Sequence, residues 1–119
     1  MVRVDELKFG SIVIGGVRHR SDVLILADGT VRRRRGGFLM FGSHSIREAE
    51  IAELLQENPD TIVIGTGTDG VARVPADIDS WAGRNNVNVV VQPSYDAVDA
   101  YNELVGQHRI TAALIHVTC

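Results

Sequence analysis

Three short apolar segments, each preceded by a helical pattern, constrain the fold of this chain more than any other feature. They cover 61–65 (TIVIG), 87–92 (VNVVVQ) and 109–117 (RITAALIHV). These segments are rich in β-branched and aliphatic residues and too short to be helices, so each is predicted to be a buried strand. Alternation of helices and strands is typical of a sheet joined by helical crossovers. We therefore expect an α/β fold whose central sheet has helical crossovers.

Three helices are expected between these strands. The first covers 45–58, where Ser45 and Glu48 have the spacing of a capping box and apolar residues repeat at helical intervals. A shorter helix is predicted over 75–85, and Ser94 is expected to cap the third helix, which has a clear apolar stripe.

The first third of the chain is rich in strand patterns. Residues 11–14 (SIVI) form a short apolar run that two glycines end, and Asp28-Gly29 predicts a hairpin turn between two further strands. We expect these strands to form an antiparallel β region beside the central sheet. No linker or repeat divides the chain, so residues 1–119 are expected to form one α/β domain.

Charge and composition argue against several classes of function. The net charge is −3, and the basic run 32–35 is expected to lie on a solvated edge strand, so no nucleic-acid partner is expected. No apolar run approaches the roughly 18 residues of a membrane span, so no membrane partner is expected either. The N-terminus (MVRVDELKFG) carries acids where a signal peptide is apolar, and Cys119 is the only cysteine. We expect a cytoplasmic protein.

A glycine motif follows the strand 61–65. Gly65, Gly67 and Gly70 have the G-x-G-x-x-G spacing of dinucleotide-binding turns. However, a dinucleotide site needs a helix at the third glycine and an acid about 20 residues later. Here the β-prone residues 71–74 delay the helix, and Gln92 stands where the acid belongs. No nucleotide or other cofactor is expected.

Two interpretations of this glycine loop remain. The loop is either a tight turn that uses positive φ angles, or a cradle for a small anion. In the second case its backbone amides would be joined by the hydroxyl groups of Thr66 and Thr68.

Other polar side chains are candidates for chemistry. His116 and Cys119 could pair as base and nucleophile, but a strand residue and a terminal residue make a poor pair, and no further metal ligands accompany them. We expect no catalytic residues and no metal, with His116 half-buried. His44 either projects into a cleft or braces its loop, and Asp22 either bonds loop backbone or faces a pocket. The run 38–41 (FLMF) is either core or an exposed patch for a partner.

The chain resembles the small family called domain of unknown function 498. The matching elements, in order, are SDVLI, GSHSI, IVIGTGTDG, AYN and AALIHVTC. Relatives in that family include a mitochondrial complex I assembly factor and an adipogenesis-associated protein. The resemblance implies a compact α/β domain with a mixed sheet and no established reaction. The positions shared with the family are Asp22, His44, Gly65, Thr66, Gly67, Asn102, His116 and Cys119.

Two functions are therefore expected. The first is a non-enzymatic protein-interaction or assembly module, which binds a protein partner or a second copy of itself. The alternative is a small-ligand or anion-binding domain, or a weak enzyme, that uses the Gly65–Gly70 loop. Its ligand site would comprise Asp22, His44, Gly65, Thr66, Gly67, Thr68, Gly70, Asn102 and His116.

Overall fold

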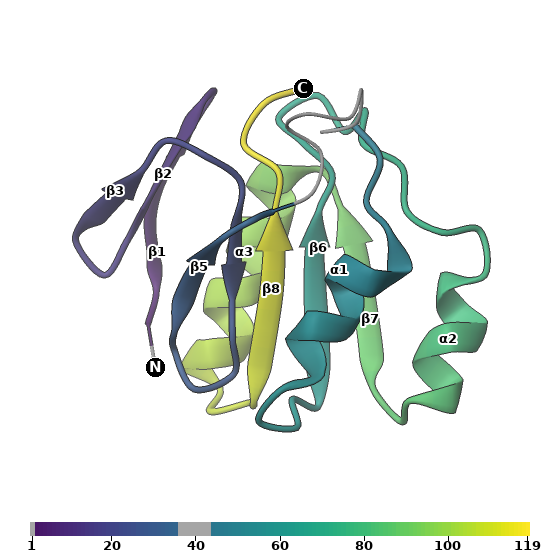
Figure 1. Cartoon of the computed structure of the whole chain (residues 1–119). Coiled ribbons are helices and arrows are strands. Elements are labelled where there is room, and N and C mark those ends of the chain that lie inside the picture. The colour runs from purple at the N-terminus through teal and green to yellow at the C-terminus, as the bar shows by residue number, and fades with distance from the viewer. Residues whose placement is uncertain (1, 36–43) are drawn as a thin grey trace.

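The computed structural model describes residues 2–35 and 44–119. Its centre is a five-stranded sheet in the order β5-β4-β8-β6-β7 (Figure 1). In this sheet β6 runs parallel to β7 and β8, whereas β4 runs antiparallel to β5 and β8. The expected α/β fold with a mixed central sheet is confirmed. The strands are β4 (Val23–Ile25), β5 (Val31–Arg33), β6 (Thr61–Gly65), β7 (Asn88–Gln92) and β8 (Thr111–Ile115).

A second sheet of three antiparallel strands packs beside the first, in the order β1-β2-β3. It consists of β1 (Val4–Lys8), β2 (Ser11–Ile14) and β3 (Val17–His19). This is the antiparallel β region expected near the N-terminus. The hairpin at Asp28-Gly29 belongs to the central sheet instead, because all three residues of β4 are buried and β8 pairs with its free edge. The sequence pattern alone did not separate these two sheets.

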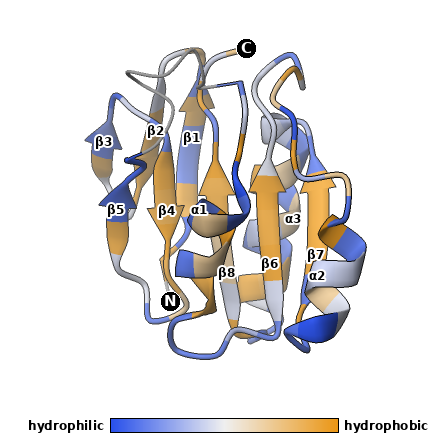
Figure 2. Ribbon diagram, turned by 45° about the vertical axis from the view of Figure 1, so that its right-hand side comes forward, coloured by the Kyte–Doolittle hydropathy of each residue, from blue (hydrophilic) through white to orange (hydrophobic). Residues whose placement is uncertain are grey.

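The helices cover both faces of the central sheet. They are α1 (Glu48–Ala52), a short 3-10 helix η1 (Glu53–Leu55), α2 (Ile78–Arg84) and α3 (Ser94–Gly106). One apolar cluster joins α1, η1 and α2 to one face, and a second joins α3 and β1–β2 to the other. The sheet between them is hydrophobic along its central strands (Figure 2). None of these helices is long and apolar enough to cross a membrane.

The crossovers create a switch point in the sheet. The chain leaves β6 through α2 on one face, and it leaves β7 through α3 on the other face before returning as β8. The carboxyl ends of β6 and β7 therefore lie where two neighbouring connections diverge. Ligands of open α/β sheets bind most often at such a point.

The first helix is shorter than the sequence pattern predicts. It begins at Glu48 rather than near Ser45, and Glu50 accepts a 2.8 Å hydrogen bond from the backbone amide of Arg47. Ser45 forms an isolated parallel bridge with Arg73 instead. The capping box predicted at Ser45 was therefore wrong, because the backbone there is already engaged with the loop that follows β6.

Two glycines allow a test of how tightly the layers pack. A methyl group on Gly65 would lie 2.7 Å from Ser94 Oγ and 3.1 Å from Ser94 Cα, whereas one on Gly83 in α2 would meet nothing within 4 Å. We expect Gly65→Ala to lower the free energy of unfolding by about 1–3 kcal/mol because it overpacks a buried contact. Gly83→Ala should raise it by about 0.5 kcal/mol, since alanine favours helix. Urea unfolding measures both, and equal effects would contradict the packing described.

Candidate functional site

Most of the polar candidates predicted from sequence gather at the carboxyl end of the parallel strands, at the top of Figure 1. Asp22 precedes β4, the glycine loop follows β6, and His116 follows β8. The end of the chain, residues 117–119, lies at the same edge. Because the parallel strands all end there, this edge collects residues that are far apart in the sequence.

A buried ionic network holds this edge together. The guanidinium group of Arg34 donates from Nη1 to Asp22 at 2.8 Å and from Nε to Glu50 at 2.7 Å. Its Nη2 donates to the Ser45 carbonyl at 2.8 Å and to Glu50 at 3.2 Å. The Arg34 side chain is only 1% exposed, and both carboxylates are 12% exposed. Charge-assisted bonds of this kind, with bidentate geometry, are among the strong ones.

Sequence reasoning missed Arg34 and Glu50. The run 32–35 was predicted to be solvated, and three of its arginines are exposed, but Arg34 is buried. Strand alternation indicates that the four side chains point to different sides, yet it does not say which of them meets acids. Those acids lie 12 and 16 residues away in sequence, so the pairing depends on the fold.

The ring of His116 extends the network. Its Nδ1 lies 2.8 Å from Asp22 Oδ2, and Asp22 Oδ1 accepts a 2.8 Å bond from the amide of Val117. An ionised carboxylate only accepts hydrogen bonds, so Nδ1 carries a proton. The ring is fully buried at 0% exposure, not half-buried as expected. The strand β8 carries it into the interior with its neighbours, since every residue of β8 is buried.

These contacts also set the ionisation of Asp22. Burial raises the pKa of Asp22, but the hydrogen bonds from His116 and from the Val117 amide, followed by the charges of His116 and the bond from Arg34, lower it more. The net effect is that the pKa of this carboxyl lies below its ordinary value. Asp22 is therefore held as a carboxylate that binds three partners, Arg34, His116 and the amide of Val117.

The opposite nitrogen of the His116 ring faces a hydroxyl group. Nε2 lies 3.3 Å from Thr118 Oγ1, so a hydroxyl, an imidazole and a carboxylate follow one another. This is the connectivity of a proton relay, in which the carboxylate orients the ring. Because His116 is wholly buried, a substrate would reach the relay through Thr118 or Asp22, which are both partly exposed. The arrangement can move a proton. It also fixes the last residues of the chain, 117–119, which we call the tail.

The glycine loop holds the end of the chain. The amide of Thr68 donates to the Thr118 carbonyl at 2.7 Å, and the amide of Val71 donates to the Cys119 oxygen at 2.9 Å. Gly67 has a φ of +111°, and a side chain there would collide with the backbone of Cys119. The loop is therefore a turn with positive φ angles, and the amides of Thr68 and Val71 are engaged with backbone oxygens of the same chain.

The hydroxyl groups near the loop are engaged as well. Ser94 Oγ donates to the His116 carbonyl at 2.6 Å and accepts from the Gly67 amide at 2.8 Å. It does not cap α3 as predicted, because those two partners occupy it. The hydroxyls of Thr66 and Thr68 donate to the Gln92 and Thr118 carbonyls, at 3.2 and 3.4 Å.

Two of the predicted site residues, His44 and Asn102, are not part of these buried contacts. The ring of His44 is exposed and stands edge-on to His116, with centroids 5.5 Å apart. Asn102 lies eight residues beyond Ser94 on α3, about 12 Å along the helix. Both polar atoms of its amide bond the backbone of Val4, each at 2.9 Å, so Asn102 joins α3 to β1. The run 38–41 lies outside the described residues.

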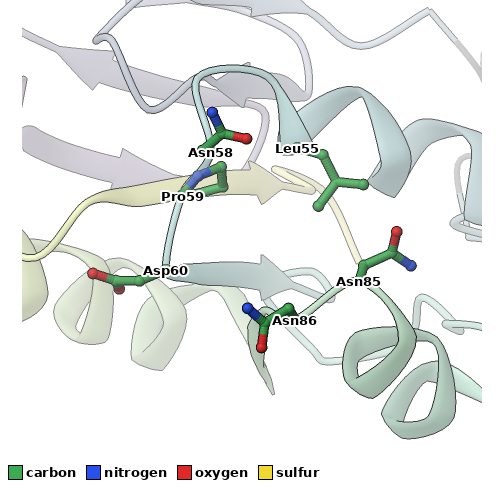
Figure 3. A pocket seen from close by; sticks show the side chains of 6 residues that line it. All are labelled: Leu55, Asn58, Pro59, Asp60, Asn85 and Asn86. Atoms are coloured by element: carbon green, nitrogen blue, oxygen red, sulfur yellow. The ribbon is translucent and has the colours of Figure 1, made fainter.

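A shallow polar pocket lies at the other end of the sheet and was not predicted. It has a volume of about 410 Å³ (Figure 3). Two of its residues, Asn58 and Asn86, have positive φ angles of 50° and 53°, a conformation that asparagine tolerates well. The lining is Leu55, Asn58, Pro59, Asp60, Asn85 and Asn86.

Two of the polar side chains of this pocket have structural partners. Asp60 accepts from Arg109 and from the Ile110 amide, and Asn85 donates to the Trp81 carbonyl. Turn geometry and these bonds explain the residue types, so we assign the pocket no ligand.

Fold and site together define a class: small α/β domains with a mixed sheet, a flanking β-meander and a tail packed in the glycine loop at the switch point. The chain belongs to the family described as "Protein of unknown function (DUF498/DUF598)", whose model matches residues 4–116. The resemblance stated from the sequence is confirmed.

Solved structures of similar proteins agree with this fold. The chain is 33% identical to a protein titled MT938, with a TM-score of 0.83 and full coverage of both chains. It is 27% identical to the conserved hypothetical protein PH1505 from Pyrococcus horikoshii OT3, with a TM-score of 0.84 and coverage of 98% and 99%. A structure described as an outer membrane protein from Bartonella henselae is 19% identical, with a TM-score of 0.80 and coverage of 99% and 96%, and shows the fold alone.

The ionic network gives a testable pH dependence. Because the pKa of Asp22 is lower in the folded chain than in the unfolded chain, its stabilising effect is present at neutral pH and is lost as pH falls below about 4. Asp22→Asn should cost about 3 kcal/mol at pH 7, since it leaves Arg34 with one charged partner fewer, and should weaken the fall in stability at acid pH.

Urea unfolding of both proteins between pH 7 and pH 3 measures this difference. Asp99→Asn, which changes an exposed carboxylate on α3, is the matched control and should stay within about 0.5 kcal/mol of the parent at pH 7. An Asp22→Asn variant as stable as the control would contradict the role given to the network.

Proposed function

We propose that this protein is a non-enzymatic interaction module that binds a protein partner through the carboxyl end of its central sheet. The observation that carries the proposal is that three large apolar side chains are exposed on segments that contact the tail. Phe9, Val71 and Tyr95 are 63%, 51% and 48% exposed. Apolar surface gathered at one place on a protein is typical of a binding site.

At or next to each of these residues, a hydrogen bond joins the chain to residues 116–119. Gly10, next to Phe9, donates to the Val117 carbonyl at 2.7 Å, and Val71 itself donates to Cys119. Tyr95 follows Ser94, whose hydroxyl binds the His116 carbonyl. Three segments that are remote in sequence are therefore tied to residues 116–119. A partner would meet a surface that is already ordered, which lowers the entropy cost of binding.

Two further considerations support a role in assembly. The glycine-loop amides of Thr68 and Val71 are already bonded to the tail, which favours protein binding over the binding of an anion. The family includes an assembly factor, which favours protein binding as the general role. We place the protein in the cytoplasm, supported by its single cysteine.

A site-specific photo-cross-linker tests the proposal. It replaces Val71 in one variant and Ile110 in a matched control, because Ile110 is similarly exposed, at 46%, but precedes β8 at the opposite end of the sheet. After irradiation in cells that normally express the protein, the Val71 variant should give a discrete adduct with another protein. The Ile110 variant should not.

A second variant confirms that the adduct reports binding. Phe9→Ser and Tyr95→Ser, combined with the cross-linker at position 71, should reduce the adduct strongly, because interface aromatic residues often carry most of the binding energy. Urea unfolding checks that the variant is folded. Equal adducts from positions 71 and 110, or none from either, would exclude this surface as the binding site.

We also propose an alternative, the binding of a small anion at the same end of the molecule. The observation that favours it is the exposed ring of His44 against the Asp22–His116 pair, beside the glycine loop. The site would use His44 and the amides of the Gly65–Gly70 loop, while the Asp22–His116 pair would position the ring of His44. An anion would have to take the amides of Thr68 and Val71 from the tail.

That displacement can be measured at Cys119. If phosphate or acetate replaces the tail, the rate at which a disulfide reagent labels the Cys119 thiol should rise with anion concentration and reach a plateau. In Gly67→Val the tail should already be displaced, because a side chain at position 67 collides with Cys119, so labelling should be fast and insensitive to the anion. A rate that stays flat in the parent protein would exclude the anion site.

A further inference from the structure

The outer edge of β7 has no partner strand among the described residues, since β7 ends the order of the sheet. Two hydrogen bonds show which backbone groups of β7 face β6: the amide of Asn88 donates to the Asp60 carbonyl, and the Gln92 carbonyl accepts from the amide of Thr66. Backbone groups alternate in direction along a strand, so Val90 also faces β6. The amides and carbonyls of Val89 and Val91 therefore point outward.

The two edges of the central sheet differ in charge. The opposite edge strand, β5, carries exposed Arg32 and Arg33, and charged side chains are a usual protection of an edge against pairing. The β7 sequence, NVVVQ, contains no charge and three valines in a row. Val91 remains 38% exposed, although valine is usually buried. This edge lacks the protection that its counterpart has.

The β7 sequence is complementary to itself when it is reversed. In an antiparallel pair centred on Val90, Asn88 faces Gln92 of the second strand, and Val89 faces Val91. Polar amides then meet polar amides, and valines meet valines. We propose that β7 is the interface of a symmetric homodimer, in which the β7 strands of two copies pair antiparallel and join the two sheets.

The register follows from the same residues. Val89 and Val91 would form hydrogen-bonded pairs on either side of the two-fold axis, because theirs are the outward-facing groups. Pro93, the next outward-facing position, has no amide hydrogen, so it ends the ladder. A short ladder predicts weak association, in the micromolar range or weaker, rather than an obligate dimer.

Sedimentation of the purified chain over protein concentrations up to about 1 mM tests the proposal. We expect a reversible monomer–dimer equilibrium. Val91→Pro should abolish it, because the ring removes an outward-facing donor, while the bonds to β6 use other residues and the monomer is kept. Val91→Thr keeps the donor and the side-chain shape, so it should still dimerise.

A pair of charge variants tests the register and does not depend on proline. Asn88→Glu with Gln92→Glu places like charges opposite each other twice across the axis, whereas Asn88→Lys with Gln92→Glu places opposite charges there. Cross-strand charge pairs of this kind should weaken dimerisation in the first variant and strengthen it in the second, by about 2- to 30-fold each.

The outcomes decide the proposal independently of the carboxyl-end surface. A parent chain that stays monomeric over the whole range overturns it, as does a folded Val91→Pro variant that still dimerises. If Val91→Pro does not fold, the charge variants decide: equal dissociation constants overturn the antiparallel register. Phe9→Ser, between β1 and β2 of the second sheet, should leave this equilibrium unchanged, so a failure of one proposal is not mistaken for a failure of the other.

Discussion

The carboxyl end of this fold depends on one buried cation. Arg34 bonds Asp22, Glu50 and the Ser45 carbonyl, and thereby ties the segment after β5 to the start of β4, to α1 and to the bridge with the β6 loop. A buried charge is costly unless it is fully paired, and no side-chain nitrogen or oxygen buried among the described residues lacks a partner. Asp22 also bonds the ring of His116, so the residue that follows β8 is held in place as well.

The tail, residues 117–119, packs against the glycine loop beside this network. At the switch point, where an open α/β sheet most often binds a ligand, the glycine loop bonds residues 118 and 119 of its own chain. Gly67 is needed for two reasons there, since its φ is positive and the Cys119 backbone lies against its Cα. The same residue types would suit a loop that binds an anion. In this structure the loop amides of Thr68 and Val71 are occupied by the backbone oxygens of Thr118 and Cys119.

The sequence predicted features that depend on local pattern. Alternating apolar segments predicted the central sheet and its crossovers, the family resemblance added that the sheet is mixed, and the delayed helix together with Gln92 argued against a dinucleotide site. The burial of Arg34 could not be foreseen, because an arginine run looks the same whether one member is paired or not. Ser94 has the sequence of a helix cap, yet its hydroxyl binds Gly67 and His116. Both differences come from partners that only the tertiary fold brings near.

The two proposed surfaces lie mostly apart, although Tyr95 follows the end of β7 by three residues. The strand β7 lies at one edge of the sheet, two strands away from β8 and three from β4, where the ionic network begins. Pairing at that edge would leave Phe9 and the tail uncovered. Because paired β7 strands run in opposite directions, the carboxyl ends of the two copies would also point in opposite directions. Such a dimer would present its partner-binding surfaces at its two ends, and a weak interface would let protein concentration control whether one partner or two are held.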